Sequence, residues 1–285
     1  MEDRKGSIGH EQLLLVEAME AKVVQHLFAE SASPERLTLK GGLAMRLLFG
    51  SSRSTQDVDL NASDSVSSMS LAKSVKHAID RMAEDMRSAG VLSDLTVTTP
   101  KQTETTCRWK IMATLSQGQR VNFKVEVSRR RHEDKASVAS RMTQPMNYPG
   151  VSIPAVMVTA YQPEMMATAK TAALLSENRT KARDVYDLYV LIRAEVKPSE
   201  HLGQWLQDEK RRTGENTSAI IERLYDKLEQ LDYETAKAQV LDYLDPGVAR
   251  FLDQDAWESM RLTVGEKIEH WIHDSDHESP MGPRP

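Results

Sequence analysis

Two aspartates in the segment Gln56-Asp57-Val58-Asp59-Leu60 have the spacing of a metal-binding pair. On a β-strand, successive side chains point to opposite faces, so Asp57 and Asp59 share one face while Val58 and Leu60 enter the core. Two neighbouring carboxylates supply oxygen ligands for a hard cation such as Mg²⁺, which proteins often share with substrate phosphates. The tripeptide alone is also typical of a solvated loop, so its surroundings must decide.

A glycine pair, Gly41-Gly42, precedes this strand within the segment LKGGLAMR. The pattern predicts a short strand, a turn at the glycines and the start of a helix. The free backbone N–H groups at a helix N-terminus favour phosphate, and glycine lets a nucleotide approach the backbone closely. A phosphate-binding turn followed by a metal-binding strand is typical of group transfer from a nucleoside triphosphate (NTP).

Glu126 lies on the polar face of a predicted strand over residues 121–128, VNFKVEVS. If this strand is a neighbour of the strand that carries Asp57 and Asp59, Glu126 becomes a third carboxylate near the metal. The alternative is an ordinary solvent-facing glutamate on an amphipathic strand.

Lys170 lies in an apolar, alanine-rich helix, where a surface lysine is less expected. Asp184 and Asp187 are three residues apart on the next helix, hence on one face. Arg183 adds a planar donor suited to phosphate or carboxylate. These residues indicate either a second part of the site or a set of salt bridges between two helices.

A basic run, SRRRH at 128–132, directly follows the Glu126 strand. Together with Lys124 and Arg183, its arginines Arg129, Arg130 and Arg131 predict a patch for a polyphosphate or an RNA backbone. A solvated surface is the alternative. Further basic residues that extend the patch if they share its face are Arg108, Lys110, Arg179 and Lys181.

The acidic strand lies in the N-terminal half of the chain. The pattern of this half predicts an α/β unit with a mixed or mainly antiparallel sheet. Alternating apolar residues predict strands, and apolar residues at helical spacing predict helices. The predicted strands are 36–40, 57–62, 105–115 and 121–128, and the predicted helices are 11–29, 43–49 and 70–90.

From about residue 160 the chain is helical. Amphipathic patterns predict helices over 163–178, 181–194, 199–212, 217–231, 234–244 and 256–274. We therefore expect an α/β core at 1–160, a helical domain at 161–273 and a disordered tail at 274–285.

Composition limits the class of protein. The 285 residues are 40% hydrophobic and 28% charged, as in a soluble globular protein. The net charge of −5 does not indicate a nucleic-acid binder, but a local basic patch suffices for binding. A single cysteine, Cys107, excludes an internal disulfide framework. We expect a cytoplasmic protein, because no signal-like N-terminus or membrane-length apolar run is present.

Taken together, these motifs resemble the AbiEii-type nucleotidyltransferase toxins of bacterial toxin–antitoxin and phage-abortive-infection pairs, which include the MenT toxins. The resemblance covers roughly residues 12–195, and its departures are Leu43 after the glycine turn, Thr55 for serine and Gln56 for glutamate. The matching segments are Lys40-Gly41-Gly42 with Arg46, Arg53 to Asp59, Lys170, and Arg183 to Tyr189.

The resemblance implies an α+β fold, with a DNA-polymerase-β-like nucleotidyltransferase core and a helical C-terminal region. It implies that Asp57 and Asp59 hold Mg²⁺ or Mn²⁺ against the triphosphate of an NTP. The residues implied to bind the nucleotide are Gly41, Gly42, Thr55, Lys40 and Arg46.

It also implies roles for the other candidates. Lys170 would neutralise phosphate charge as pyrophosphate departs. Asp187, or alternatively Asp184, would orient Lys170 or support the acceptor, and Glu126 would activate the acceptor hydroxyl.

The activity implied by the resemblance is transfer of a nucleotide to the 3′ end of a tRNA, which blocks translation and growth, with a cognate antitoxin as partner. Two alternatives stay open. One is nucleotidyl transfer to a protein or a small molecule, and the other is a nucleotide-binding growth inhibitor without turnover.

Overall fold

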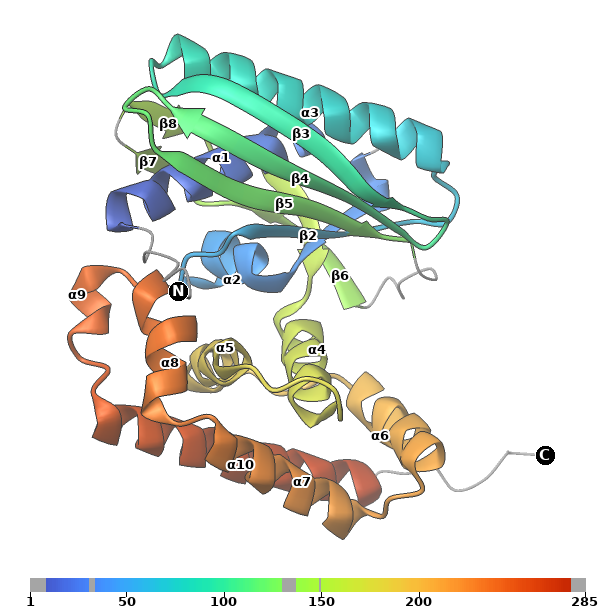
Figure 1. Cartoon of the computed structure of the whole chain (residues 1–285). Coiled ribbons are helices and arrows are strands. Elements are labelled where there is room, and N and C mark those ends of the chain that lie inside the picture. The colour runs from blue at the N-terminus through green and yellow to red at the C-terminus, as the bar shows by residue number, and fades with distance from the viewer. Residues whose placement is uncertain (1–8, 31–33, 130–136, 149, 278–285) are drawn as a thin grey trace. The chain divides into compact units, whose positions relative to one another are not determined.

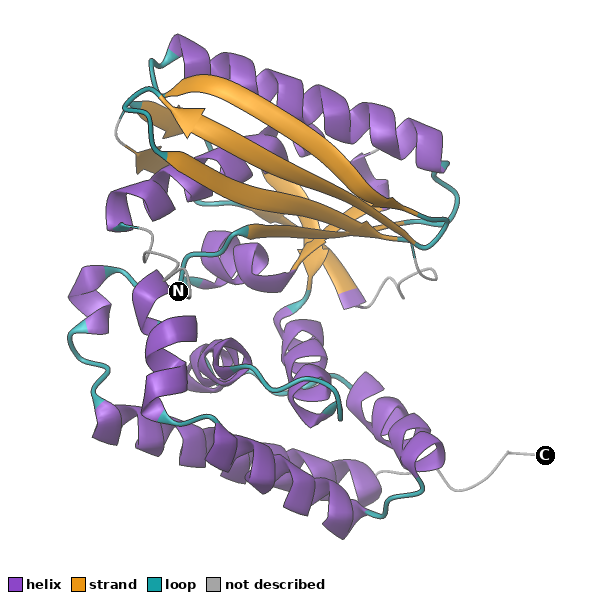
Figure 2. Ribbon diagram, in the orientation of Figure 1, coloured by secondary structure: helices purple, strands orange, loops and turns teal. Residues whose placement is uncertain are grey.

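A computed structural model of the protein describes residues 9–30, 34–129, 137–148 and 150–277. The chain divides into two compact units, Met1–Gln162 and Pro163–Pro285, called here the N-terminal and C-terminal units (Figure 1). The first combines helices with a sheet and the second is helical (Figure 2). Among the described residues, no helix is both long enough and apolar enough to cross a membrane.

The N-terminal unit is built on a mixed seven-stranded sheet of order β3-β4-β5-β2-β1-β9-β6. The pairs β1–β9 and β2–β5 are parallel, and the other neighbours are antiparallel, which confirms the predicted α+β class with a mixed sheet. The strands are β1 Leu37–Lys40, β2 Asp57–Ala62, β3 Leu92–Gln102, β4 Thr106–Leu115, β5 Arg120–Ser128, β6 Val138–Met142 and β9 Met157–Tyr161, while β7 Met146–Tyr148 and β8 Val151–Ile153 form a separate hairpin.

Three helices pack on this sheet, namely α1 His10–Ala29, α2 Gly41–Phe49 and α3 Ser68–Ser88. The alternating residues of β4 and β5, such as Trp109, Ile111 and Val125, are buried on one face. Figure 1 shows α1 and α3 behind that part of the sheet, with β3, β4 and β5 in front of α1. The other face of these three strands therefore carries the polar residues of each alternation.

The sequence did not predict β3 or the strands from β6 to β9. β3 is an edge strand of the sheet, and most of its side chains beyond Leu92 are exposed. It also contains Pro100, which an edge strand tolerates and a central strand does not. An exposed edge strand lacks the apolar alternation on which strand prediction relies.

The C-terminal unit contains α4 Pro163–Leu175, α5 Ala182–Arg193, α6 His201–Thr213, α7 Thr217–Gln230, α8 Tyr233–Gln239, α9 Pro246–Ala249 and α10 Gln254–His277. The predicted single helix over 234–244 is wrong, because α8 ends at Gln239 and a short 3₁₀ turn, Leu241–Tyr243, follows. The backbone leaves the α-helical region at Val240, which is fully buried, so tertiary packing overrides helical spacing there.

The end of α10 corrects the expected tail. Residues 274–277 belong to the last turn of this helix, and the structure describes nothing beyond His277. Asp276 accepts hydrogen bonds from Lys210 Nζ at 2.7 Å and Thr217 Oγ1 at 2.5 Å. These contacts with α6 and α7 hold the last turn, although its composition is typical of a disordered segment.

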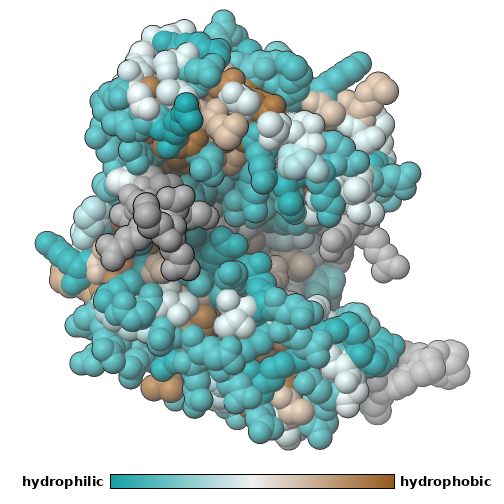
Figure 3. Space-filling model, in the orientation of Figure 1, coloured by the Kyte–Doolittle hydropathy of each residue, from teal (hydrophilic) through white to brown (hydrophobic). Residues whose placement is uncertain are grey.

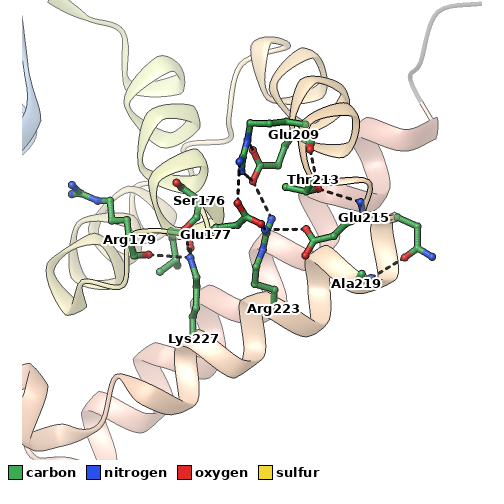
Figure 4. Close-up of polar contacts among 12 residues, drawn as sticks. Ser176, Glu177, Arg179, Glu209, Thr213, Glu215, Ala219, Arg223 and Lys227 are labelled. Atoms are coloured by element: carbon green, nitrogen blue, oxygen red, sulfur yellow. Dashed lines mark hydrogen bonds and ion pairs between the residues drawn. The ribbon is translucent and has the colours of Figure 1, made fainter.

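A buried lysine, Lys227 of α7, holds the connection between α4 and α5 (Figure 4). Its ammonium donates to the carbonyl oxygens of Leu174 at 3.1 Å and Arg179 at 3.0 Å, and also to that of Ser176. Burial, followed by the nearby Arg223, lowers the pKa of Lys227. Three carbonyl acceptors match the three donors of an ammonium group, so this lysine caps the end of α4 and the segment that follows it.

Arg223 joins the same connection to two further helices (Figure 4). Its guanidinium lies 3.2 Å from Glu209 of α6, 2.9 Å from Glu215 before α7 and 3.6 Å from Glu177 in the connection. The segment between α4 and α5 is therefore held in place by two cations of α7, Arg223 and Lys227.

We expect Lys227→Met to lower the free energy of unfolding of the full chain by about 2–4 kcal/mol, because it leaves three buried carbonyls without a charged donor. Urea denaturation followed by circular dichroism measures this change. The matched control is Lys267→Met on the exposed face of α10. Equal unfolding midpoints for the two variants would contradict the structural role of Lys227.

Candidate active site

The central position of β2 brings the predicted carboxylates together. Across the parallel pair β2–β5, Asp57 is opposite Lys124 and Asp59 is opposite Glu126. Val58 between the aspartates is fully buried, so both aspartates point to the opposite face of the sheet. The two strands are neighbours, and Glu126 therefore lies beside Asp59 on the same face.

The glycine turn lies directly against these acids. Gly41 has a φ of +73°, and a Cβ there would lie 2.5 Å from Asp59 Oδ2. A Cβ on Gly42 would lie 3.0 Å from Arg53 Nη2 and 3.1 Å from Thr55 Oγ1. Positive φ and close approach both require glycine at position 41, so the N-terminus of α2 rests on Asp59 and on the segment before β2.

Charge is concentrated around the two aspartates. Burial, followed by the nearby Asp57, raises the pKa of Asp59, against the opposing effects of Lys40 and Lys124. Lys124 Nζ lies 3.3 Å from Asp57 Oδ1. Lys40, opposite Asp59 in the β1–β2 register, donates to Asn61. Two lysines thus partly compensate the repulsion between the carboxylates.

Glu126 has a partner of its own. Arg108 of β4 is opposite Glu126 and donates from Nε to Glu126 Oε2 at 2.7 Å, with Nη2 contacting the same oxygen. The predicted activation of an acceptor hydroxyl by Glu126 stays a prediction, and it requires Glu126 to act while Arg108 is nearby.

The acidic pair suits a cation that is shared with a substrate. Among the described residues there is no group of three or more histidine, cysteine, aspartate or glutamate side chains arranged to hold a metal ion. Mg²⁺, however, is usually bound through one or two carboxylates, with substrate phosphates and water completing its coordination. Asp57 and Asp59 fit that case and do not fit a closed metal site formed by protein alone.

A buried carboxylate, Glu17 of α1, supports the segment that leads into β2. It accepts hydrogen bonds from Arg46 Nε at 2.9 Å, Ser54 Oγ at 2.6 Å and Tyr148 Oη at 2.8 Å. Arg46 also donates to the carbonyl of Ser51 at 3.0 Å. Glu17 therefore ties α1 to α2, to the segment before β2 and to β7.

Glu20 lies one turn further along the same helix and is fully buried. Its two carboxylate oxygens have no hydrogen-bond partner within the described part of the chain. Burial, followed by Asp57, Glu17 and Asp59, raises the pKa of Glu20 well above its usual range. The carboxyl group is therefore driven toward its neutral form.

In the C-terminal unit, Lys170 of α4 meets both aspartates of α5. Its Nζ lies 2.5 Å from Asp187 Oδ2 and 3.4 Å from Asp184 Oδ1. Both aspartates are fully buried, and the Lys170 side chain is 11% exposed. The geometry is that of an ion-pair set between two helices, in which the lysine is more accessible than either aspartate.

Arg179, in the connection between α4 and α5, completes this set. It donates to Asp184 through Nε at 2.7 Å and Nη2 at 3.0 Å. Burial alone would raise the pKa of Asp184, but Lys170 and Arg179 outweigh burial and lower it. Asp184 is therefore held as a carboxylate between two cations, while Asp187 pairs with Lys170.

The sequence profile of the nucleotidyl transferase AbiEii toxin family, described as part of a type IV toxin–antitoxin system, matches residues 22–260. This match covers most of the chain. The chain belongs to the AbiEii nucleotidyltransferase family. No protein with a curated description matches it.

Solved structures share the AbiEii chain's fold. JHP933 from Helicobacter pylori is 19% identical with a TM-score of 0.52, over 96% of this chain and all of that one. A putative nucleotidyltransferase from H. pylori is 19% identical with a TM-score of 0.53, over the same shares. The nucleotidyltransferase toxin MenT4 from Mycobacterium tuberculosis is 16% identical with a TM-score of 0.50, over 94% and 93%.

The residues of the predicted basic patch of this AbiEii chain lie in different parts of the structure. Lys124 lies beside Asp57, as described above. Arg129 donates to the main-chain oxygens of Glu104 and Val66, each at 2.8 Å, and so ties two loops together. Arg183 belongs to α5 of the C-terminal unit, and Arg130 and Arg131 lie outside the described residues.

Glu17 was not predicted from the sequence, and Arg53 was noted only as the start of a matching segment, without a role of its own. Arg53 is 4% exposed, lies against Gly42 and donates to the carbonyl of Ser54. Arg46, predicted to bind the nucleotide, is engaged by Glu17, and its contact with a nucleotide stays a prediction. A usable signal was present for Glu17, because Glu17 and Glu20 fall on the apolar face of a helix, where an acid needs a partner.

Replacing Glu20 and Glu17 by glutamine is expected to have opposite effects on stability. When folding raises the pKa of a carboxyl group, the free energy of unfolding of the protein falls as the pH rises from the group's unfolded pKa to its folded pKa. Glu20→Gln removes that loss, so at pH 8 the free energy of unfolding rises by at least about 1 kcal/mol. Glu17→Gln breaks a buried ion pair and lowers it by about 2 kcal/mol or more.

Urea unfolding of both variants and the wild-type chain at pH 5 and pH 8 measures these differences. The gain from Glu20→Gln should shrink at pH 5, where the wild-type carboxyl is closer to neutral in both states. A loss of stability in Glu20→Gln at both pH values would show that the carboxylate has a stabilising partner.

Proposed function

We propose that this AbiEii nucleotidyltransferase uses an NTP with Mg²⁺ or Mn²⁺ to transfer a nucleoside monophosphate to the 3′ end of a tRNA. Blocked translation would then arrest growth. The observation that carries this proposal is the contact between the N-terminus of α2 and Asp59, with Asp57 on the same face. Backbone amides of a kind suited to phosphate and carboxylates of a kind suited to a metal ion thus lie side by side, which supports the proposal.

In the proposed reaction, the 3′-hydroxyl oxygen of the RNA attacks the α-phosphorus of the NTP and forms a new phosphodiester bond. The bond from the α-phosphorus to the bridging oxygen of the β-phosphate breaks, and pyrophosphate leaves. The hydroxyl proton passes to a base, for which Glu126 is the candidate beside Asp59. A bound divalent cation would stabilise the attacking and leaving oxygens.

The chain's own residues would do the remaining work. The amides of Gly41 and Gly42 would hold the phosphates, and Asp57 and Asp59 would hold the cation. Lys170 would compensate phosphate charge as pyrophosphate leaves, with Asp187 orienting its ammonium through the 2.5 Å contact.

The family description supports a toxin that is controlled by an antitoxin. We propose a cognate antitoxin protein as partner of this chain. Since NTPs and tRNA are cytoplasmic molecules, the proposed reaction takes place in the cytoplasm.

The proposal predicts that the purified protein moves label from [α-³²P]NTP, but not from [γ-³²P]NTP, into total RNA. Oxidising the RNA ends with periodate should abolish labelling, because it destroys the 3′-terminal hydroxyls. Asp57→Asn with Asp59→Asn should abolish labelling and leave folding intact, since neutral isosteres relieve repulsion among buried carboxylates. Asp80→Asn on α3 is the exposed control and should keep wild-type activity.

Other outcomes select other functions. Label in a protein band or a small molecule would replace the RNA acceptor by that acceptor. Growth arrest that survives the double substitution, without label in any fraction, would replace catalysis by nucleotide binding alone.

Substitutions at Lys170 distinguish a catalytic role of this lysine from a structural one. Lys170→Met should lower turnover at least about 100-fold, and also destabilise the chain, because the buried carboxylate of Asp187 loses the ammonium that lies against it. Adding Asp187→Asn removes the carboxylate charge that Lys170 balances and should restore stability without restoring turnover.

Turnover and urea midpoints of both variants give the answer. If turnover returned together with stability in the double variant, Lys170 would be a structural lysine of the helix pair.

A further inference from the structure

One face of the N-terminal sheet continues outward from the acidic pair, and among the described residues of that unit no helix covers it over β3, β4 and β5 (Figure 1). In the strand register, Asp57 is followed by Lys124 of β5, Lys110 of β4 and Thr98 of β3. Lys110 and Thr98 are exposed. The same face holds Arg120, Asn122, Lys124 and Glu126 on β5, Arg108, Lys110, Met112 and Thr114 on β4, and Asp94, Thr96, Thr98 and Lys101 on β3.

The charge of this face is unevenly neutralised. The acids next to the site have cationic partners, since Arg108 binds Glu126 and Lys124 is near Asp57. On β3, at the outer edge, this face carries one acidic residue, Asp94. By contrast, three exposed cations form no ion pair with any residue that the structure describes, and these are Lys101, Lys110 and Arg120.

The size of the face suits a short polyanion. Strands are spaced about 4.8 Å apart, so the distance from β2 to β3 is roughly 14 Å. Along β5, the six residue-to-residue steps from Arg120 to Glu126 add roughly 20 Å at about 3.4 Å per step. A surface of these dimensions can contact the backbone of a few nucleotides.

The composition of the face distinguishes a nucleic-acid backbone from other partners. Trp109 and Phe123 point to the buried side and are each 3% exposed, so the described part of the face has no aromatic platform for bases. Met112 is the large apolar side chain on it, at 54% exposure, whereas a protein interface usually has an apolar centre. Figure 3, in the view where β3, β4 and β5 lie in front of α1, shows hydrophilic residues along these strands around a smaller apolar patch over β3 and β4.

We propose that this face carries the acceptor RNA, with Lys101, Lys110 and Arg120 contacting phosphates and leading the 3′ end toward Asp57 and Asp59. This inference rests on the proposed RNA acceptor and adds the path by which it is bound. Contacts of this kind are sensitive to salt and independent of base sequence.

Charge reversal tests the path. Lys110→Glu with Arg120→Glu is compared with Lys73→Glu with Arg87→Glu, which makes the same charge change at exposed positions of α3. The face variant should raise KM for RNA at least about tenfold and leave kcat and KM for NTP within about twofold. Loss of two phosphate contacts should also reduce the slope of log affinity against log salt by about 1.4 for a single-stranded oligoribonucleotide.

Each outcome has a separate meaning. A wild-type chain that labels no RNA would reject the proposed acceptor, and this inference with it. Suppose that the wild-type chain labels RNA, and that the face variant does so with the same KM for RNA as the wild type and the α3 control. That result would reject only the RNA path and leave the proposed function standing. An equal rise of KM for RNA in the face variant and the α3 control would mean that only the net charge of the protein matters, and it would also reject the path.

Discussion

The buried carboxylate of Glu17 is the interaction on which the candidate nucleotide site depends. A buried charge is tolerated only when its acceptor oxygens are used, and three donors from three different segments serve Glu17. Through Arg46 and Ser54 it fixes α2 relative to the segment before β2. Only with α2 in this place can Gly41 lie against Asp59, so the active geometry is set from the core outward.

The same geometry gathers like charges at some cost in stability. Asp57, Asp59 and Glu126 share one face of neighbouring strands, and Glu20 is buried behind them without a hydrogen-bond partner in the described chain. Repulsion and burial raise the pKa of Asp59 and Glu20, which a fold selected for stability alone would avoid. An excess of negative charge of this kind would suit the cation and nucleotide of the proposed reaction.

Local patterns predicted much of this arrangement. Alternation placed Asp57, Asp59 and Glu126 on polar strand faces, and the glycine pair marked the start of α2. The tertiary contacts could not be predicted from these local patterns. They are the parallel pairing of β2 with β5, the contact of Arg108 with Glu126, and the acceptance by Glu17 of hydrogen bonds from three distant donors. Each depends on segments far apart in sequence, joined by packing and strand register, which a single sequence does not display.

The polar sheet face also bears on specificity. Because Trp109 and Phe123 are used in the core, the described strands offer an RNA charged and polar side chains and no aromatic surface for stacking. Contacts to phosphates position an RNA but do not read its bases. If the acceptor follows this face, a choice among RNAs must come from elsewhere, either from the shape of the folded RNA or from the fit of its terminal nucleotide beside Asp57 and Asp59. Selectivity would then lie in the reaction step more than in binding, and affinity alone would be a poor guide to the true acceptor.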